Sequence, residues 1–172
     1  MRFKLTALAI LLILATAQAE VTAGLGLFSW QEKVPVILNQ NKFDTNATFS
    51  SLGPSVGYER LLTLKYRAGV SACYHSGVID ILKLDGAIAP RHNFTSYWLA
   101  SKILYRWSQT FALGPNFLFS QKQIERLPGS TSYGLFLNLE YDIFNEVKLI
   151  QSLGSVGDSG SLAYSFNLVR TF

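Results

Sequence analysis

A two-residue alternation of apolar and polar side chains runs through most of this chain and constrains its fold more than any other feature. It is clearest at 131–144, where Tyr, Leu and Ile alternate with Gly, Asn, Glu and Asp. The segment 162–172 alternates in the same way. Because successive side chains of a β-strand point to opposite faces, this period predicts strands with one apolar and one mainly polar face.

Eight segments carry this pattern. They are predicted as strands at 20–30, 51–59, 62–75, 96–107, 110–121, 131–144, 147–155 and 160–172. Their connections alternate between tight turns and longer segments, the longest being 31–50 and 76–95. This arrangement is typical of an up-and-down antiparallel barrel. The predicted fold is therefore all-β, an eight-stranded transmembrane β-barrel.

The alternation defines two faces but does not say which one lies inside. The apolar face is too bulky for the interior of a small barrel, whereas the Gly, Ser, Ala and Asn face fits one. Aromatic residues also gather at the strand ends, as two belts at membrane interfaces do. One set lies beside the short turns, at Tyr58, Tyr105, Trp107, Phe111, Tyr141 and Phe172, and the other beside the long connections, at Tyr74, Tyr97, Phe119, Tyr133 and Tyr164. A membrane barrel is favoured, and a secreted, soluble barrel of lipocalin type carrying an apolar ligand is the alternative.

The N-terminus predicts export. A cationic head precedes an apolar run of 11 residues, 5–15, and Ala17 and Ala19 supply the small residues of a cleavage site. The run is shorter than the roughly 20 residues of a spanning helix, so we expect a signal peptide at 1–19 rather than an anchor. The barrel domain is then 20–172. Cleavage removes Arg2 and Lys4 and lowers the formal net charge from +4 to +2, so the charge does not indicate a nucleic-acid partner.

The leader, the alternating connections and the final strand resemble the small eight-stranded outer-membrane barrels of Gram-negative bacteria, of the OmpA and OmpX type. The resemblance implies a monomer in the bacterial outer membrane that contacts outer-membrane lipid and the barrel-assembly machinery. It implies an assembly signal in the C-terminal strand at Tyr164, Phe166, Leu168 and Phe172. Arg170 departs from the family pattern, in which an apolar residue is usual.

Charged residues on the polar face are expected inside the barrel. They are Glu59, Lys65, Arg67, Lys102, Arg106, Glu140, Asp142 and Lys148. Buried charges must pair or be hydrated, so we expect a salt-bridge network that plugs the lumen. A narrow pore for small ions or solutes is the alternative.

An enzyme that modifies lipid A is a further alternative. The only histidines are His75 and His92, and Ser76 points to the opposite face from its neighbour His75. We therefore expect no catalytic residues, no metal and no cofactor. A structural or surface-interaction role is predicted, with any extracellular ligand bound through 31–50 and 76–95. No residue pattern identifies that ligand.

Overall fold

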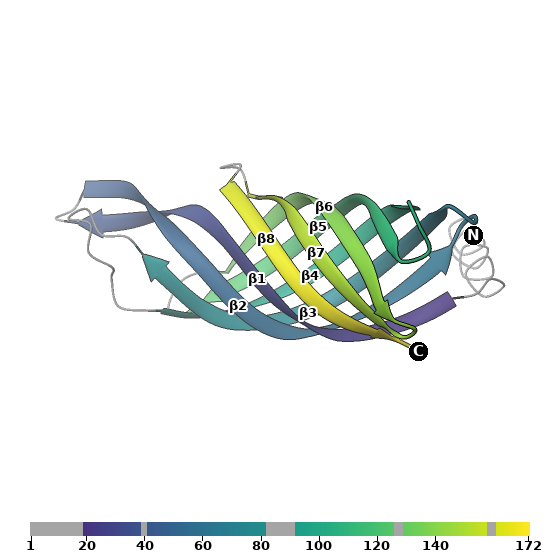
Figure 1. Cartoon of the computed structure of the whole chain (residues 1–172). Coiled ribbons are helices and arrows are strands. Elements are labelled where there is room, and N and C mark those ends of the chain that lie inside the picture. The colour runs from purple at the N-terminus through teal and green to yellow at the C-terminus, as the bar shows by residue number, and fades with distance from the viewer. Residues whose placement is uncertain (1–18, 39–40, 82–91, 126–128, 158–160) are drawn as a thin grey trace, which may run out of the picture.

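The computed structural model describes residues 19–38, 41–81, 92–125, 129–157 and 161–172. These residues form eight strands that close into one antiparallel barrel, in which β1 pairs with β8 (Figure 1). The strands are β1 (Ala19–Leu38), β2 (Asn41–Leu61), β3 (Tyr66–Ile81), β4 (His92–Arg106), β5 (Phe111–Ile124), β6 (Ser130–Phe144), β7 (Val147–Val156) and β8 (Ser161–Thr171). The predicted eight-stranded up-and-down barrel is confirmed. No helix within these ranges is long and apolar enough to cross a membrane. Apart from Ala19, the predicted signal peptide lies outside the described residues.

The tight turns all lie at one end of the barrel, together with the end of β8, at the right in Figure 1. The predicted strand at 62–75 is wrong at its start, because 62–65 form the turn between β2 and β3. Leu62 N donates to Tyr66 O at 2.8 Å, and Thr63 Oγ1 accepts from the backbone N–H groups of Lys65 and Tyr66. These local hydrogen bonds compete with continued strand pairing.

Much of the two long connections predicted at 31–50 and 76–95 is strand instead. β1 continues to Leu38 and β2 begins at Asn41. β1 pairs with β8 only as far as Trp30, and β2 pairs with β3 only from Ala47 onward. Of the described residues, 31–38 and 41–46 therefore extend past the neighbouring strands as a two-stranded ribbon, which projects at the left in Figure 1. We call this the β1–β2 ribbon.

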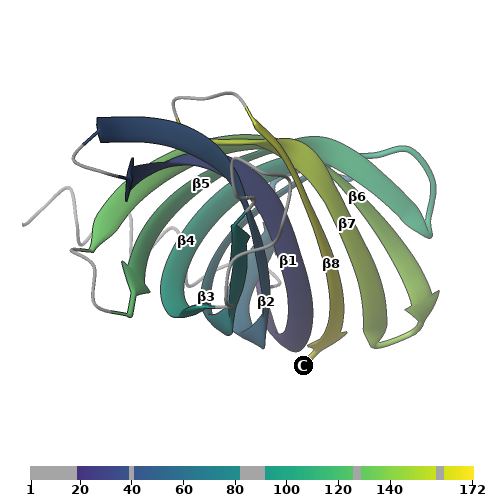
Figure 2. The ribbon, with the colours of Figure 1, turned by 90° about the vertical axis from the view of Figure 1, so that its left-hand side faces the viewer.

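The barrel wall is apolar on its outer face and carries small, polar or charged side chains inward along much of its length. Figure 2 shows the strands curving around a common interior. Outward side chains such as Leu25, Val56, Leu99 and Leu135 are more than half exposed. A water-soluble barrel would bury this set, so the structure has the face orientation of a barrel in lipid.

Aromatic side chains gather on the outer face at both ends. Near the tight turns, Phe111 and Tyr141 contact each other with ring centroids 4.9 Å apart. Near the opposite end, Tyr74 and Tyr97 contact each other at 5.1 Å. Within each predicted belt, neighbouring strands therefore bring two rings into contact as a cross-strand pair.

Gly53 and Pro54 interrupt the pairing between β2 and β3 without changing its register. Leu52 pairs with Ser76 and Ser55 with Cys73, but the two positions between them do not pair with β3. Proline has no N–H to donate, and a Cβ on Gly53 would lie 1.8 Å from the backbone oxygen of Tyr74. Gly53 is therefore required by the close approach of β3.

Replacing Gly53 with alanine is expected to lower the free energy of unfolding by about 1–3 kcal/mol, because a rigid backbone oxygen must move to admit the methyl group. The measurement is the urea midpoint of the folded protein in lipid vesicles. Gly129→Ala is the matched control, since there a Cβ would lie 2.9 Å from the flexible end of Gln123. Equal midpoints for the two variants would contradict the prediction.

Candidate functional site

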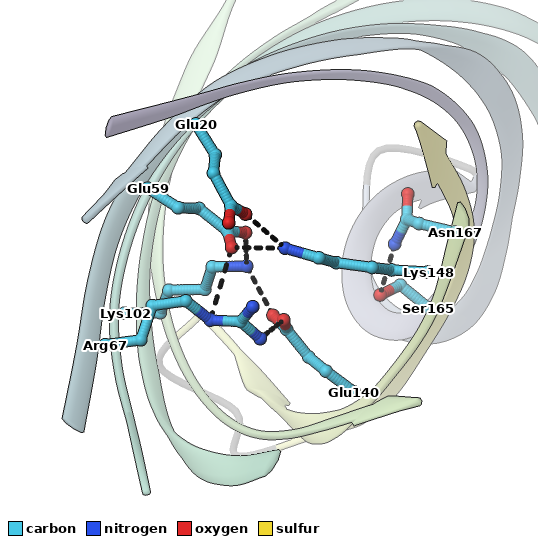
Figure 3. A network of polar contacts seen from close by, with 8 residues as sticks. All are labelled: Glu20, Glu59, Arg67, Lys102, Glu140, Lys148, Ser165 and Asn167. Carbon is cyan, nitrogen blue, oxygen red and sulfur yellow. Dashed lines mark hydrogen bonds and ion pairs between the residues drawn. The ribbon is translucent and has the colours of Figure 1, made fainter. Parts of the chain in front are cut away.

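Six charged side chains from six strands meet inside the barrel near the tight-turn end. They are Glu20 of β1, Glu59 of β2, Arg67 of β3, Lys102 of β4, Glu140 of β6 and Lys148 of β7 (Figure 3). We call this set the ionic layer. Its three cations balance its three carboxylates. The ionic layer connects strands on opposite sides of the lumen.

Glu59 is the centre of the ionic layer. Its carboxylate lies 2.5 Å from Lys102 Nζ, 3.1 Å from Lys148 Nζ and 3.3 Å from Arg67 Nε. Gly69, which pairs with both Glu59 and Lys102, leaves room for this contact, because a Cβ there would lie 3.0 Å from Lys102 Cε and 3.1 Å from Glu59 Cγ.

Glu140 reaches across the lumen from β6. Arg67 Nη2 donates to its Oε2 at 2.6 Å, and Lys102 Nζ donates to its Oε1. Lys148 Nζ contacts Glu20 at 2.9 Å as well as Glu59. Charged groups removed from water are stable only when they are paired and hydrogen-bonded, and these pairs meet that condition.

A cluster of rings fills the half of the lumen nearer the β1–β2 ribbon. We call it the aromatic layer, and its members are Phe28, Trp30, Phe49, Phe94, Trp98 and Phe136. Trp30 stacks on Phe49 at 4.7 Å and meets the edges of Phe94 and Trp98 at 5.5 and 5.3 Å. The expectation that the interior holds mainly small side chains is wrong in this half.

A further ion pair lies on the ribbon side of the aromatic layer. Lys122 Nζ donates to Glu32 Oε2 and lies 4.8 Å from the centre of the Phe49 ring. Trp30 Nε1 also donates to Glu32 Oε2, at 3.3 Å. The sequence prediction missed this pair because its strands ended at 30 and 121, two residues before Glu32 and one residue before Lys122.

A cavity of about 80 Å³ separates the two layers. It is bounded by Glu59 and Lys102 on one side and by Phe28 and Trp98 on the other, with Ser, Thr and Asn side chains between them. Three buried atoms that line it have no hydrogen-bond partner among the described residues, namely Asn116 Oδ1, Asn138 Oδ1 and His75 Nε2. Polar side chains line part of the cavity, and its volume is large enough for several water molecules.

The serine that accompanies His75 in the structure is Ser51 rather than the adjacent Ser76. His75 Nδ1 lies 3.4 Å from Ser51 Oγ, and the Ser51 hydroxyl donates to Phe28 O at 3.2 Å. The pair is buried beneath the rings of Phe28 and Trp98, 6.2 and 6.5 Å from the imidazole. His92 lies elsewhere, exposed at the start of β4.

Five of the eight residues predicted for the charge network meet in the ionic layer, and three do not. Lys65 is exposed because it lies in the β2–β3 turn rather than in a strand. Arg106 and Asp142 are half-buried at the ends of β4 and β6, and neither forms an ion pair with any described residue. Glu20 was missed, although it shares a face with Thr22, Phe28 and other even-numbered residues of β1.

The predicted assembly residues Tyr164, Phe166, Leu168 and Phe172 are exposed on the outer face of the C-terminal segment. Arg170 lies among them. Its Nη2 donates to Glu146 at 2.8 Å, and its guanidinium carbon lies 5.2 Å from the Phe172 ring centre. The departure from the family pattern is thus accommodated by an exposed ion pair at the tight-turn end.

No group of three or more His, Cys, Asp or Glu side chains within the described part of the chain is placed to hold a metal ion.

Solved structures of bacterial outer-membrane proteins share this fold. OprG from Pseudomonas aeruginosa matches with a TM-score of 0.53 and 11% identity over 92% of this chain and 98% of its own. Neisserial surface protein A matches with a TM-score of 0.52 and 12% identity over 89% and 95%. Ail from Yersinia pestis, in a phospholipid bilayer nanodisc, matches with a TM-score of 0.51 and 12% identity over 91% and 99%. The chain therefore has the fold of the eight-stranded outer-membrane barrels. No protein-family model and no curated protein sequence matches it.

Proposed function

We propose that this chain is an integral protein of the bacterial outer membrane whose lumen is closed and whose role is structural or surface-interacting. The outward apolar face, the two aromatic belts and the shared fold support the location. We also propose that a leader at 1–19 is cleaved on export, and that the outward residues Tyr164, Phe166, Leu168 and Phe172 are recognised by the barrel-assembly machinery.

The observation that carries the closed lumen is that two different layers fill it in series. The ionic layer obstructs the tight-turn half, and the aromatic layer obstructs the ribbon half. Trp30 and Glu140 are only 2% and 1% exposed. An ion crossing the barrel would have to separate buried ion pairs and then displace packed rings, and both steps are costly.

The narrow pore is the second candidate, and the cavity between the layers, which is partly lined by Ser, Thr and Asn, is the observation that favours it. The two alternatives differ in a planar lipid bilayer. We expect the folded protein to give no stable single-channel steps under conditions in which a porin does. Stable steps would contradict the closed lumen.

The membrane location is tested before recording. The sample must remain in the detergent phase and migrate differently in gels when unheated, because a detergent-free soluble product would contradict the membrane location.

The position of the histidines supports a non-enzymatic role. His75 is 3% exposed, and three residue pairs of the β3–β4 ladder lie between it and His92. Among the described residues, neither histidine faces the lipid beside a serine and an acid, as acyl-chain chemistry at the barrel wall requires.

The β1–β2 ribbon is the segment we propose for surface interaction. It extends beyond the barrel wall at the end opposite the tight turns, where outer-membrane barrels have their extracellular loops. Its exposed side chains include Gln31, Lys33 and Asp44. Such a ribbon presents polar side chains beyond the barrel wall, where they are accessible to a partner outside the cell.

A further inference from the structure

The lipid-facing wall of the barrel is hollowed along β2 to β5. Two open grooves of about 670 and 480 Å³ lie there, and they share Tyr58, Val70, Ser101 and Phe117. Because they share these lining residues, they form one continuous depression. We call it the wall groove.

Small side chains alternate with the larger Val70, Leu99 and Ile103 on the floor of the wall groove. Ala68 and Ala72 point outward from β3, and Ser101 points outward from the adjoining strand β4, where it pairs with Val70. Larger side chains border this floor on both sides. They are Val56 and Tyr58 on β2, and Pro115, Phe117 and Phe119 on β5. The groove follows from the placement of three small residues on two paired strands between two bulkier ones.

The end of the wall groove nearer the tight turns is basic. Arg60, the penultimate residue of β2, lines it together with Leu62, and Lys65 lies exposed in the adjoining turn. Arg170, an outward-facing arginine at the same end but on β8, lies outside the groove. An elongated apolar groove that ends at a basic side chain complements a molecule with an anionic head and an apolar tail.

We propose that the wall groove holds one glycerophospholipid of the inner leaflet, with an acyl chain along Ala68, Ala72 and Ser101 and its phosphate at Arg60. The inference rests on the proposed membrane location. The tight turns of outer-membrane barrels face the periplasm, so Arg60 lies at the level of inner-leaflet headgroups. A cylindrical chain fits an open groove, whereas a second copy of the barrel presents a convex wall.

Retention of this lipid depends on packing and charge rather than on the hydrophobic effect. Other lipid tails are as apolar as the wall, so an ordinary lipid exchanges freely with its neighbours. A chain in the groove gains van der Waals contact from β3, β4 and the bordering rings. The guanidinium of Arg60 adds an ion pair with the phosphate, and basic groups near a membrane surface attract anionic lipid in this way.

Native mass spectrometry of the whole protein, purified in detergent from bacterial membranes, tests the inference. We expect one phospholipid adduct on the folded protein. Arg60→Gln is expected to lower the bound fraction about fivefold, the loss of one headgroup charge contact. Ser101→Phe is expected to abolish the adduct because the ring fills the groove floor.

Two matched variants serve as controls. Arg170→Gln removes an outward arginine at the same end, and Gln151→Phe adds a ring to the outer face of β7, outside the groove. Both are expected to keep the adduct. Each variant is first checked for folding by its different migration in unheated gels.

The outcomes are distinct. A folded, detergent-bound protein without a phospholipid adduct would overturn this inference and leave the proposed location intact. Equal adducts on all variants, adducts of lipid A, or adducts of detergent alone would also overturn it. A protein that stays soluble without detergent would instead overturn the proposed location.

Discussion

Replacing Glu140 with alanine is expected to lower the free energy of unfolding by about 3–5 kcal/mol. The Glu140 side chain is fully buried and contacts Arg67 Nη2 at 2.6 Å and Lys102 Nζ. Its removal leaves two buried cations, Arg67 and Lys102, that share Glu59 with Lys148. Breaking a buried pair from one side is costly for this reason, even where the intact pair contributes little net stability.

Urea unfolding in lipid vesicles, followed by tryptophan fluorescence, measures the Glu140→Ala effect. Glu146→Ala is the control, because Glu146 and Arg170 also form an ion pair but are 61% and 60% exposed. That exposed pair is expected to contribute less than about 1 kcal/mol. Equal losses in the two variants would show that the ionic layer is hydrated and energetically similar to the surface.

A double-mutant cycle separates the interaction energy of Lys102 with Glu140 from the energy lost when the packing of each side chain is removed. Lys102→Ala combined with Glu140→Ala is expected to cost less than the sum of the two single variants, because the second change removes a charge that the first left unpaired. Additive losses would contradict a direct contact between the two side chains.

Replacing Trp30 with alanine is the other change with a large expected effect, about 3–5 kcal/mol of unfolding free energy. Trp30 is 2% exposed and contacts Phe28, Phe49, Phe94 and Trp98. Truncation therefore leaves a cavity in the middle of the aromatic layer. The surrounding strands are paired on both sides and cannot collapse to fill it.

The same urea titration measures this loss. Unfolding is monitored by migration in unheated gels, because the missing tryptophan would alter a fluorescence signal. Leu64→Ala is the control, because Leu64 is 90% exposed in the β2–β3 turn. The control is expected to change stability by at most about 0.5 kcal/mol. A Trp30→Ala midpoint equal to that of Leu64→Ala would contradict a packed aromatic layer.

The site was partly predictable for a local reason. The inward direction of Glu59, Arg67 and Glu140 follows from parity along their own strands, so sequence reasoning placed them inside. Phe28 and Trp30 lie on the same face of β1 as Glu20. Their large side chains were nonetheless not expected in the interior of a small barrel. Lys65 was misplaced because Thr63 supports a turn that a two-residue period does not reveal.

The β1–β2 ribbon was less predictable than the barrel. Val34, Pro35 and Val36 break the alternation between 31 and 38, and proline is uncommon inside a strand. The ribbon nonetheless forms. Beyond Trp30, β1 pairs with β2 alone, so its other edge carries no ladder of hydrogen bonds.

The sequence by itself determined that this chain forms strands, that they are joined up and down, and that each has an apolar and a polar face. These properties follow from the local period of two and from the spacing of the turns. Only the tertiary structure decided which inward side chains meet across the lumen, such as Glu140 of β6 with Arg67 of β3, and that two layers fill it. Those contacts depend on how the strands are staggered around the closed barrel, which is set by the pairing of all eight strands together and not by any one segment.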